Sequence, residues 1–246
     1  MLVVEELKKK IPNATQVSKM MDQTFPLRRR EIVTKEPDVQ RMVERWPALF
    51  TERQVVAEFN RITSKNLEGD FYKALDQHTP RFIELFRSKK GMSGQKLTDL
   101  MCHINWMSPD VTALRSVVLK GLPILLGDDS SEVYKTCYDT TKEEVLASVT
   151  VGVLTVVSED PQQQLLNAVH FQPISNAIII EGGTVMDNIR DFPQAVCLIF
   201  GLIYALHLDY PKCMANTFTF IQAVMLGLGS KSLPPKLLGL KNKLLM

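Results

Sequence analysis

The chain has few of the residues that build metal, redox or nucleophilic sites. Its 246 residues include four cysteines and four histidines, and neither a C-x-x-C nor a G-x-S-x-G motif occurs. Such sites depend on defined spacings, because several ligands, or a nucleophile and its base, must meet in one place. We therefore predict no catalytic residue, no metal site and no cofactor. The cysteines are Cys102, Cys137, Cys197 and Cys213.

The sequence also lacks a secretory signal and an apolar run of membrane length. The first residues, MLVVEELKKK, turn charged after four apolar positions, too early for a signal peptide. The most apolar stretch, QAVCLIFGLIYALHL, lies in the 17 residues between Asp191 and Asp209. As a helix these span about 25 Å, less than a hydrocarbon core of about 30 Å. We predict a buried helix at 192–208 capped by Asp191, no membrane association, and an intracellular protein, cytoplasmic or nuclear.

Charge is nearly balanced overall but uneven along the chain. The net charge of +2 is too small to indicate a dedicated nucleic-acid protein. Residues 1–100 carry 19 Lys and Arg against 14 Asp and Glu, residues 101–230 carry 6 against 13, and residues 231–246 carry four lysines and no acid. Blocks of opposite sign attract one another or an external partner.

Periodicity and turn residues predict an α+β fold with two regions and a tail. Residues 1–125 have the spacing of successive helices, and residues 126–230 have the β-branched runs of a smaller sheet around the apolar helix 192–208. We expect the multi-helix region to pack on this sheet. The basic Leu/Lys tail, 231–246, is either a loose tail or a short docking helix.

Proline and glycine predict where the helices stop. We expect prolines, Pro26 among them, to cut residues 13–50 into short helices, and Pro80 to break the helix that contains it. The helix predicted in SPDVTALRSVVLKGLP should be capped by Ser108 and end near Gly121.

Three stretches of the second region predict strands. EVYKTCYD alternates, SVTVGVLTVV is typical of a strand covered on both faces, and SNAIIIEGGTVMD indicates a hairpin with Gly182-Gly183 as its turn. Among residues that could carry chemistry, His207 is predicted to be a core histidine, and Trp46 and Trp106 to be core or groove aromatics.

Clustered basic residues are the best candidates for binding a partner. Arg28, Arg29 and Arg30 are consecutive, and three of them spread around a helix can contact phosphates or a partner's acids. The tail adds a second basic group, formed by Lys231, Lys236, Lys241 and Lys243. If the arginines bind a partner, reversing all three to glutamate should abolish its capture without lowering thermal stability.

Four phrases of the sequence resemble a known family. They are MMDQTFPLRRREIV, ERWPALFTERQVVAEFNRIT, FYKALDQHTPRFIELFR and FGLIYALHLDYPKCMANTFTFIQAVMLGL. They resemble the region downstream of the sterile alpha motif in sterile-alpha-motif-domain-containing protein 3-like proteins, and the likeness extends over nearly the whole chain. The motif itself is absent from this sequence. The resemblance implies a role in protein association and supplies no activity, catalytic residue or cofactor.

The first hypothesis is therefore a non-enzymatic protein-interaction or scaffold module, with an unknown partner that is acidic or a second copy of the chain. An alternative is a nucleic-acid-binding protein of mobile-element ancestry, suggested by the family's many copies, which would use the basic N-terminal patch. A third is an enzyme with an unrecognised site, which requires a deep polar pocket near His170, His207 or Asp187.

Overall fold

Helices make up the first half of the chain in the computed structural model. The structure describes residues 2–102, 104–138, 147–157, 174–229 and 233–245. The elements of the first half are the helices α1 (Leu2–Leu7), α2 (Ala14–Lys35) and α3 (Val39–Arg45), the 3-10 helix η1 (Pro47–Phe50), and the helices α4 (Glu52–Thr63), α5 (Leu67–Ser88), α6 (Gly91–Met101) and α7 (Val111–Leu126).

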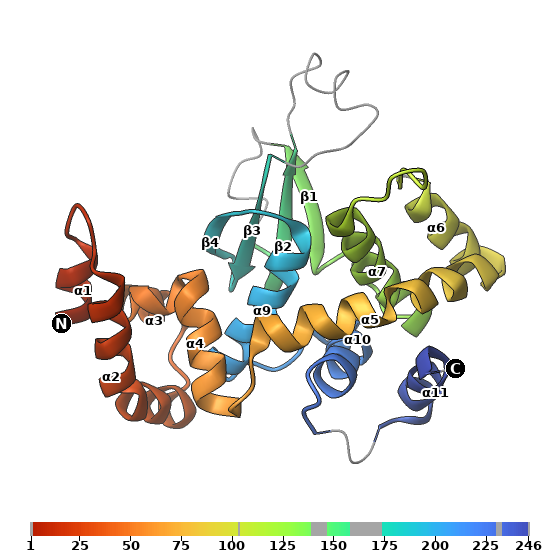
Figure 1. Cartoon of the computed structure of the whole chain (residues 1–246). Helices are drawn as coiled ribbons and strands as arrows, with labels where there is room; N and C mark the ends of the chain where they lie inside the picture. The colour runs from red at the N-terminus through yellow and green to blue at the C-terminus, as the bar shows by residue number, and fades with distance from the viewer. Residues whose placement is uncertain (1, 103, 139–146, 158–173, 230–232, 246) are drawn as a thin grey trace.

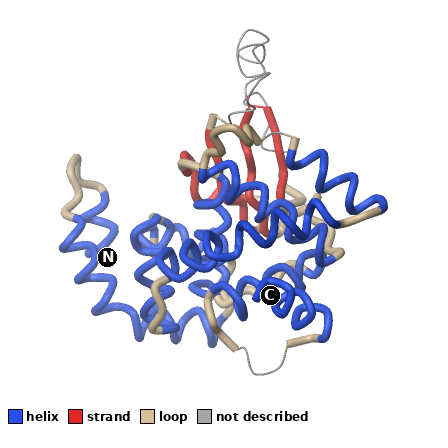
Figure 2. The backbone as a smooth tube through the Cα atoms, turned by 45° about the vertical axis from the view of Figure 1, so that its right-hand side comes forward, coloured by secondary structure: helices blue, strands red, loops and turns tan. Residues whose placement is uncertain are grey.

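A sheet and further helices follow in the second half. The strands are β1 (Tyr134–Tyr138), β2 (Val151–Val157), β3 (Ser175–Ile180) and β4 (Gly183–Ile189). The later helical elements are α9 (Phe192–Leu206), η3 (Lys212–Met214), α10 (Ala215–Phe220), the π-helix η4 (Ile221–Met225) and α11 (Pro235–Leu245). Figure 2 shows the strands grouped at one end, with helices forming the rest of the molecule. The predicted α+β class is confirmed.

The four strands form one mixed sheet in the order β1-β2-β3-β4. β1 runs parallel to β2, and the other two pairs are antiparallel. Val153 and Ile178 pair in register and face α9, while Leu154 and Ile179 form a small apolar cluster on the opposite face. β2 is thus covered on both faces, as its β-branched sequence predicts.

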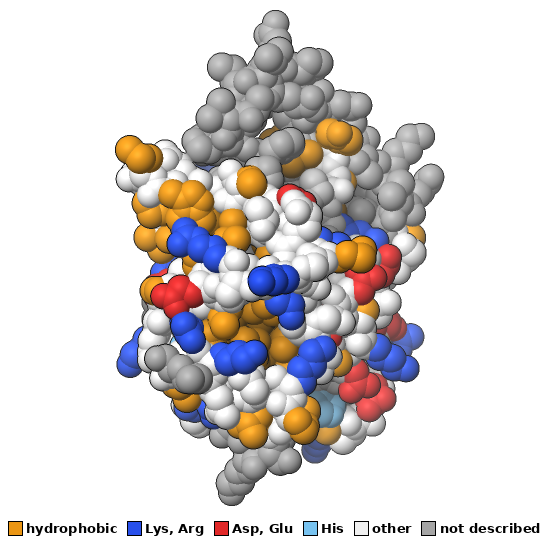
Figure 3. Space-filling model, turned by 90° about the vertical axis from the view of Figure 1, so that its right-hand side faces the viewer, with side chains coloured by type: hydrophobic (Ala, Val, Ile, Leu, Met, Phe, Trp, Pro, Cys, Tyr) orange, Lys and Arg blue, Asp and Glu red, His pale blue; other side chains and the backbone are white. Residues whose placement is uncertain are grey.

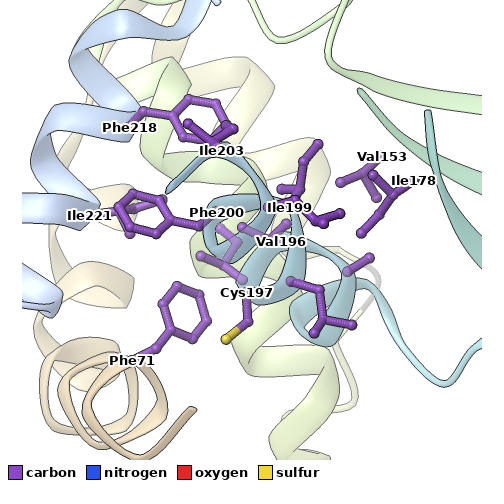
Figure 4. Close-up of a cluster of buried hydrophobic side chains, with 14 of the residues drawn as sticks. Phe71, Val153, Ile178, Val196, Cys197, Ile199, Phe200, Ile203, Phe218 and Ile221 are labelled. Atoms are coloured by element: carbon purple, nitrogen blue, oxygen red, sulfur yellow. The ribbon is translucent and has the colours of Figure 1, made fainter. Parts of the chain in front are cut away.

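Helix α9 is the centre of the molecule. Fourteen of its fifteen residues are buried, and the Asp191 side chain caps it by accepting from Gln194 N at 2.8 Å. Figure 1 shows α9 between the sheet and helices α4 and α5. In Figure 4, Val196 and Ile199 lie toward the sheet, while Phe200 lies near Phe218 and Ile221. The predicted core helix is confirmed. It ends at Leu206, before Pro211, because His207 takes a left-handed conformation with φ 59°.

Gly201 lets a neighbouring helix approach α9 closely. A Cβ atom at this position would lie 2.7 Å from both Val55 Cγ1 and Leu67 Cδ2. Gly201 therefore receives α4 and the start of α5, and its close neighbours come from this helix pair.

Two helices continue through prolines that were predicted to interrupt them. Pro26 lies inside the 22-residue α2 and Pro80 inside the 22-residue α5, so both predictions are wrong. Pro26 is exposed, and buried residues on either side hold the two halves of α2 against the core. Figure 1 shows α2 changing direction along its length, as expected for a helix with an internal proline.

Two predicted helix ends and one turn are displaced. Helix α7 is capped by Asp110, which accepts from Ala113 N at 2.8 Å, and it ends at Gly127. Gly121 lies inside α7, close to Phe86 and Leu97. The hairpin turn consists of Glu181 and Gly182, both with positive φ, because Ile180 pairs with Gly183.

One apolar core crosses the predicted boundary at residue 125. Its buried members run from Val17 in α2 to Leu244 in α11 and include sheet residues such as Ile178. Helix α11 packs on α5 through Leu237, Leu240 and Leu244, so the tail contains a helix docked on its own chain. Within the described ranges, no helix has both the length and the apolar composition that a membrane crossing needs.

Candidate functional site

Arg28, the first of the three consecutive arginines, is fully buried. Its Nε donates to Glu58 Oε1 at 2.7 Å, and its Nη2 donates to Glu58 Oε2. The remaining hydrogens reach Thr24 Oγ1 at 3.0 Å and the Met21 carbonyl at 3.2 Å. Every nitrogen of the guanidinium thus has a partner inside the protein, and Arg28 presents no charge to the surface.

The ion pair of Arg28 belongs to a network that joins α2 to α4. Arg61 Nη1 donates to Glu58 Oε2 at 2.7 Å, and Arg61 Nε donates to Asp22 Oδ1 at 2.8 Å. The Arg28 guanidinium also lies 5.4 Å from the centre of the Trp46 ring, a cation–π contact. The structure changes one expectation: Arg28→Glu would set two carboxylates together in the core, so we now expect charge reversal to lower stability.

The other two arginines have different surroundings. Arg29 is half-buried, and its Nη1 donates to the carbonyls of Tyr204 at 3.2 Å and Ala205 at 3.5 Å, at the C-terminal end of α9. A cation is favoured there by the helix dipole, although burial lowers the pKa of Arg29. Arg30 alone is exposed. Of the predicted triplet, only Arg30 is available to a partner in this structure.

The tail lysines lie far from the arginines. Lys236 and Lys243 of α11 are exposed and Lys241 is half-buried, while Lys231 lies outside the described residues. Figure 1 shows α2 and α11 at opposite ends of the molecule. The two predicted basic groups therefore do not form one surface, and their partner-binding role stays a prediction.

A different surface combines exposed apolar and basic side chains. Trp106 is 43% exposed, Met107 is 97% exposed and Met92 is 83% exposed. The Arg87 guanidinium lies 4.5 Å from the centre of the Trp106 ring, which joins the end of α5 to the loop before α7. We use the name Trp106 surface for Arg87, Trp106 and Met107 together with three exposed residues that follow Arg87 in the sequence, Lys89, Lys90 and Met92.

The basic residues of the Trp106 surface have no acidic partner in the described part of the chain. Arg87, Lys89 and Lys90 are exposed, and none forms an ion pair with a described carboxylate. Figure 3, which faces the side of α6, shows hydrophobic side chains next to Lys and Arg side chains. The prediction that Trp106 is a core or groove residue missed this exposure. The signal for it was the pair Trp106-Met107, two large apolar residues in a segment that precedes a Ser-Pro-Asp helix start.

The described residues offer no metal cluster and no chemistry at the predicted histidines. No group of three His, Cys, Asp or Glu side chains among them could hold a metal ion. His207 is exposed at the end of α9, so the prediction of a core histidine is wrong at that position. His78 is buried, which lowers its pKa. Neither His207 nor Asp187 lines the hollow between α6, α7 and β1 or the one beside Asn13 at the start of α2, and His170 lies outside the described residues.

The N-terminal helices match a known family. Residues 1–51, which contain α1, α2, α3 and η1, match the family model described as sterile alpha motif domain-containing protein 3, helical domain. Comparisons with curated proteins and with solved structures found no match. The match over residues 1–51 supports the assignment of this chain to the sterile alpha motif domain-containing protein 3-like family.

Proposed function

We propose that the chain is a non-enzymatic protein-interaction module that binds an acidic, amphipathic segment of a partner protein at the Trp106 surface. The observation that carries the proposal is the exposed Trp106 ring under the Arg87 guanidinium, beside the exposed Met107. Large apolar side chains rarely gather on a surface without a binding role.

The residue types of the surface support a protein partner. Tryptophan and arginine are the residues most enriched among those that dominate binding energy at protein interfaces, and methionine adapts to irregular contacts. Trp106 is already held by Arg87, so less side-chain freedom is lost when a partner covers it.

The charge of the surface supports an acidic partner. Arg87, Lys89 and Lys90 lie within four positions of one another. Their unpaired charges would attract glutamate or aspartate side chains and speed association. Apolar side chains between those acids would then cover Trp106 and Met107.

We place the module inside the cell, in the cytoplasm or nucleus. Cys102, Cys197 and Cys213 carry free thiols, and Cys102 is exposed. Such thiols are typical of reducing compartments. This location supports a partner among intracellular proteins.

The proposal is tested by affinity capture from cell lysate with the full chain and with the variant Arg87→Glu/Trp106→Ala. We expect at least one acidic protein to be captured by the parent chain and lost by the variant, because the variant removes both the aromatic anchor and the cation. Captured proteins are identified and quantified by mass spectrometry.

The matched control is Lys10→Glu/Ile11→Ala, which reverses one exposed cation and truncates one exposed apolar residue between α1 and α2. This control should capture the same proteins as the parent. Equal capture by the Arg87→Glu/Trp106→Ala variant, or no capture by the parent, would refute the proposal. Capture that nuclease treatment abolishes would favour the nucleic-acid alternative instead.

A further inference from the structure

A hollow of about 470 Å³ lies where α6, α7, β1 and the start of α9 meet. Lys96 and Asp99 come from α6, Lys120 from α7, and Tyr134 and Lys135 from β1. Its volume falls in the range of small-molecule sites. The hollow is separate from the Trp106 surface, because the two share no residue.

Lys120 is the central observation. Its side chain is half-buried, and no described carboxylate lies within ion-pair distance of its ammonium group. The Nζ atom lies 4.8 Å from the centre of the Phe192 ring. Burial lowers the pKa of Lys120. A cation held partly out of water without a counter-ion lowers stability, and an anionic ligand would remove that cost.

Tyr134 of β1 also lines the hollow, and Phe192 contacts both Tyr134 and Lys120. Its hydroxyl is buried without a hydrogen-bond partner among the described residues. Its ring packs edge-to-face on Phe192, with centroids 5.0 Å apart.

The hollow has three other charged lining residues, Lys96, Asp99 and Lys135. Lys135 pairs with Glu132 at 3.2 Å, and Lys96 is exposed at the rim. Asp99 is also exposed, and its Oδ1 accepts from Gln95 at 2.8 Å. The lining therefore has three cations against one acid, with an apolar wall formed by Leu100, Ile124 and Phe192.

We propose that this hollow binds a small organic oxyanion, with its phosphate or carboxylate group on Lys120 and its apolar part against Leu100, Ile124 and Phe192. Both oxyanions accept charge-assisted hydrogen bonds from ammonium groups. The apolar wall favours a ligand that carries a ring or a short hydrocarbon chain over a bare inorganic ion.

The test is isothermal titration of the full chain with phenyl phosphate, benzoate and inorganic phosphate in separate arms. We expect saturable binding of at least one aromatic anion, and weaker binding of inorganic phosphate. The stronger of the two aromatic arms identifies the preferred oxyanion. No saturable heat with any probe up to about 10 mM, which would leave a Kd no better than millimolar, overturns the proposal.

Variants locate the binding. Lys120→Met keeps the apolar stem, removes the charge and should weaken binding roughly tenfold. Lys73→Met changes an exposed lysine of α5 outside the hollow and should leave binding unchanged. Equal loss in both variants, or none in Lys120→Met, rejects the hollow as the site. Thermal unfolding verifies that each variant folds, and if Lys120→Met does not, Lys96→Met at the exposed rim is tested against the same expectation.

Discussion

At the scale of single residues, the three consecutive arginines of α2 have three different surroundings. Arg28 is enclosed with Glu58, Arg29 binds the end of α9, and Arg30 faces solvent. Residues one position apart on a helix point about 100° from each other, so one side chain can reach the core while the next reaches water. The sequence shows the three charges but not which of them finds a carboxylate from α4.

The buried pair gives a stability prediction. Arg28→Met should lower the free energy of unfolding by roughly 3 kcal/mol, because among the described residues Glu58 then keeps only Arg61 as an ion-pair partner. Urea unfolding followed by circular dichroism measures the change. Arg30→Met, on the exposed neighbour, should stay within about 0.5 kcal/mol of the parent. A cost below about 1 kcal/mol for Arg28→Met would show that the pair contributes little.

Lys120 gives a pH prediction. Burial lowers its folded-state pKa below the usual value of about 10.4, so the unfolded chain binds the proton more readily between the two values. The unfolding free energy therefore rises with pH through that window. Lys120→Met should be more stable than the parent at pH 7, and its advantage should fade as the pH nears 10.

Urea midpoints of Lys120→Met and parent at the two pH values test this prediction. Their difference isolates Lys120, because the neighbouring Lys96, Lys135 and Tyr134 are common to both chains. An advantage that is constant with pH would assign the effect to packing instead of charge.

At the scale of helices and strands, apolar periodicity and capping residues correctly predicted the elements whose formation depends mainly on burial. Helix α9, its Asp191 cap and the strand β2, covered on both faces, are confirmed. Long apolar or β-branched runs are predictable because they are stable only when they are buried. The local penalties at Pro26 and Pro80 were outweighed by burial on both sides of each proline. Local residue preferences alone do not reveal that balance, which depends on contacts distant in sequence.

The candidate surface was less predictable than the fold for a related reason. Apolar periodicity indicates which residues pack inside, and it gives no rule for an apolar residue that stays outside. Trp106 and Met107 lie in a loop, where no helical or strand period applies. Their exposure follows from where α6 and α7 place that loop.

Gly201 gives a prediction at the scale of helix packing. In Gly201→Ala the new methyl would lie 2.7 Å from Val55 Cγ1 and Leu67 Cδ2, so these fully buried side chains, or the helices that carry them, must shift. We expect a net loss of about 1–2 kcal/mol, since overpacking outweighs the helix propensity of alanine. The control is Gly239→Ala in α11, where a methyl meets no atom within 4 Å and should stabilise by up to about 1 kcal/mol. Urea unfolding that ranks the two variants equally would contradict close packing at Gly201.

At the scale of the whole molecule, the helical region and the sheet share α9 as a common interior. Phe59 of α4 packs edge-to-face on Phe200 at 6.1 Å, and Ile178 of β3 belongs to the same apolar cluster. A shared interior couples the unfolding of its parts, because exposing one side of α9 also exposes the other. The boundary predicted near residue 125 would then separate two regions of the sequence that still unfold together as one cooperative unit.

This coupling is testable with a reporter far from the substitution. The chain has two tryptophans, so Trp106→Phe leaves the buried Trp46 as the only one, at the N-terminal end of the molecule. In that background, Ile178→Ala in β3 should lower the unfolding free energy by about 3 kcal/mol. The urea midpoint from Trp46 fluorescence should fall together with the midpoint from circular dichroism, whereas Thr184→Ala at an exposed position of β4 should move neither. If the Trp46 midpoint stays fixed while the circular dichroism transition shifts or splits, the two regions unfold separately and residue 125 marks a true domain boundary.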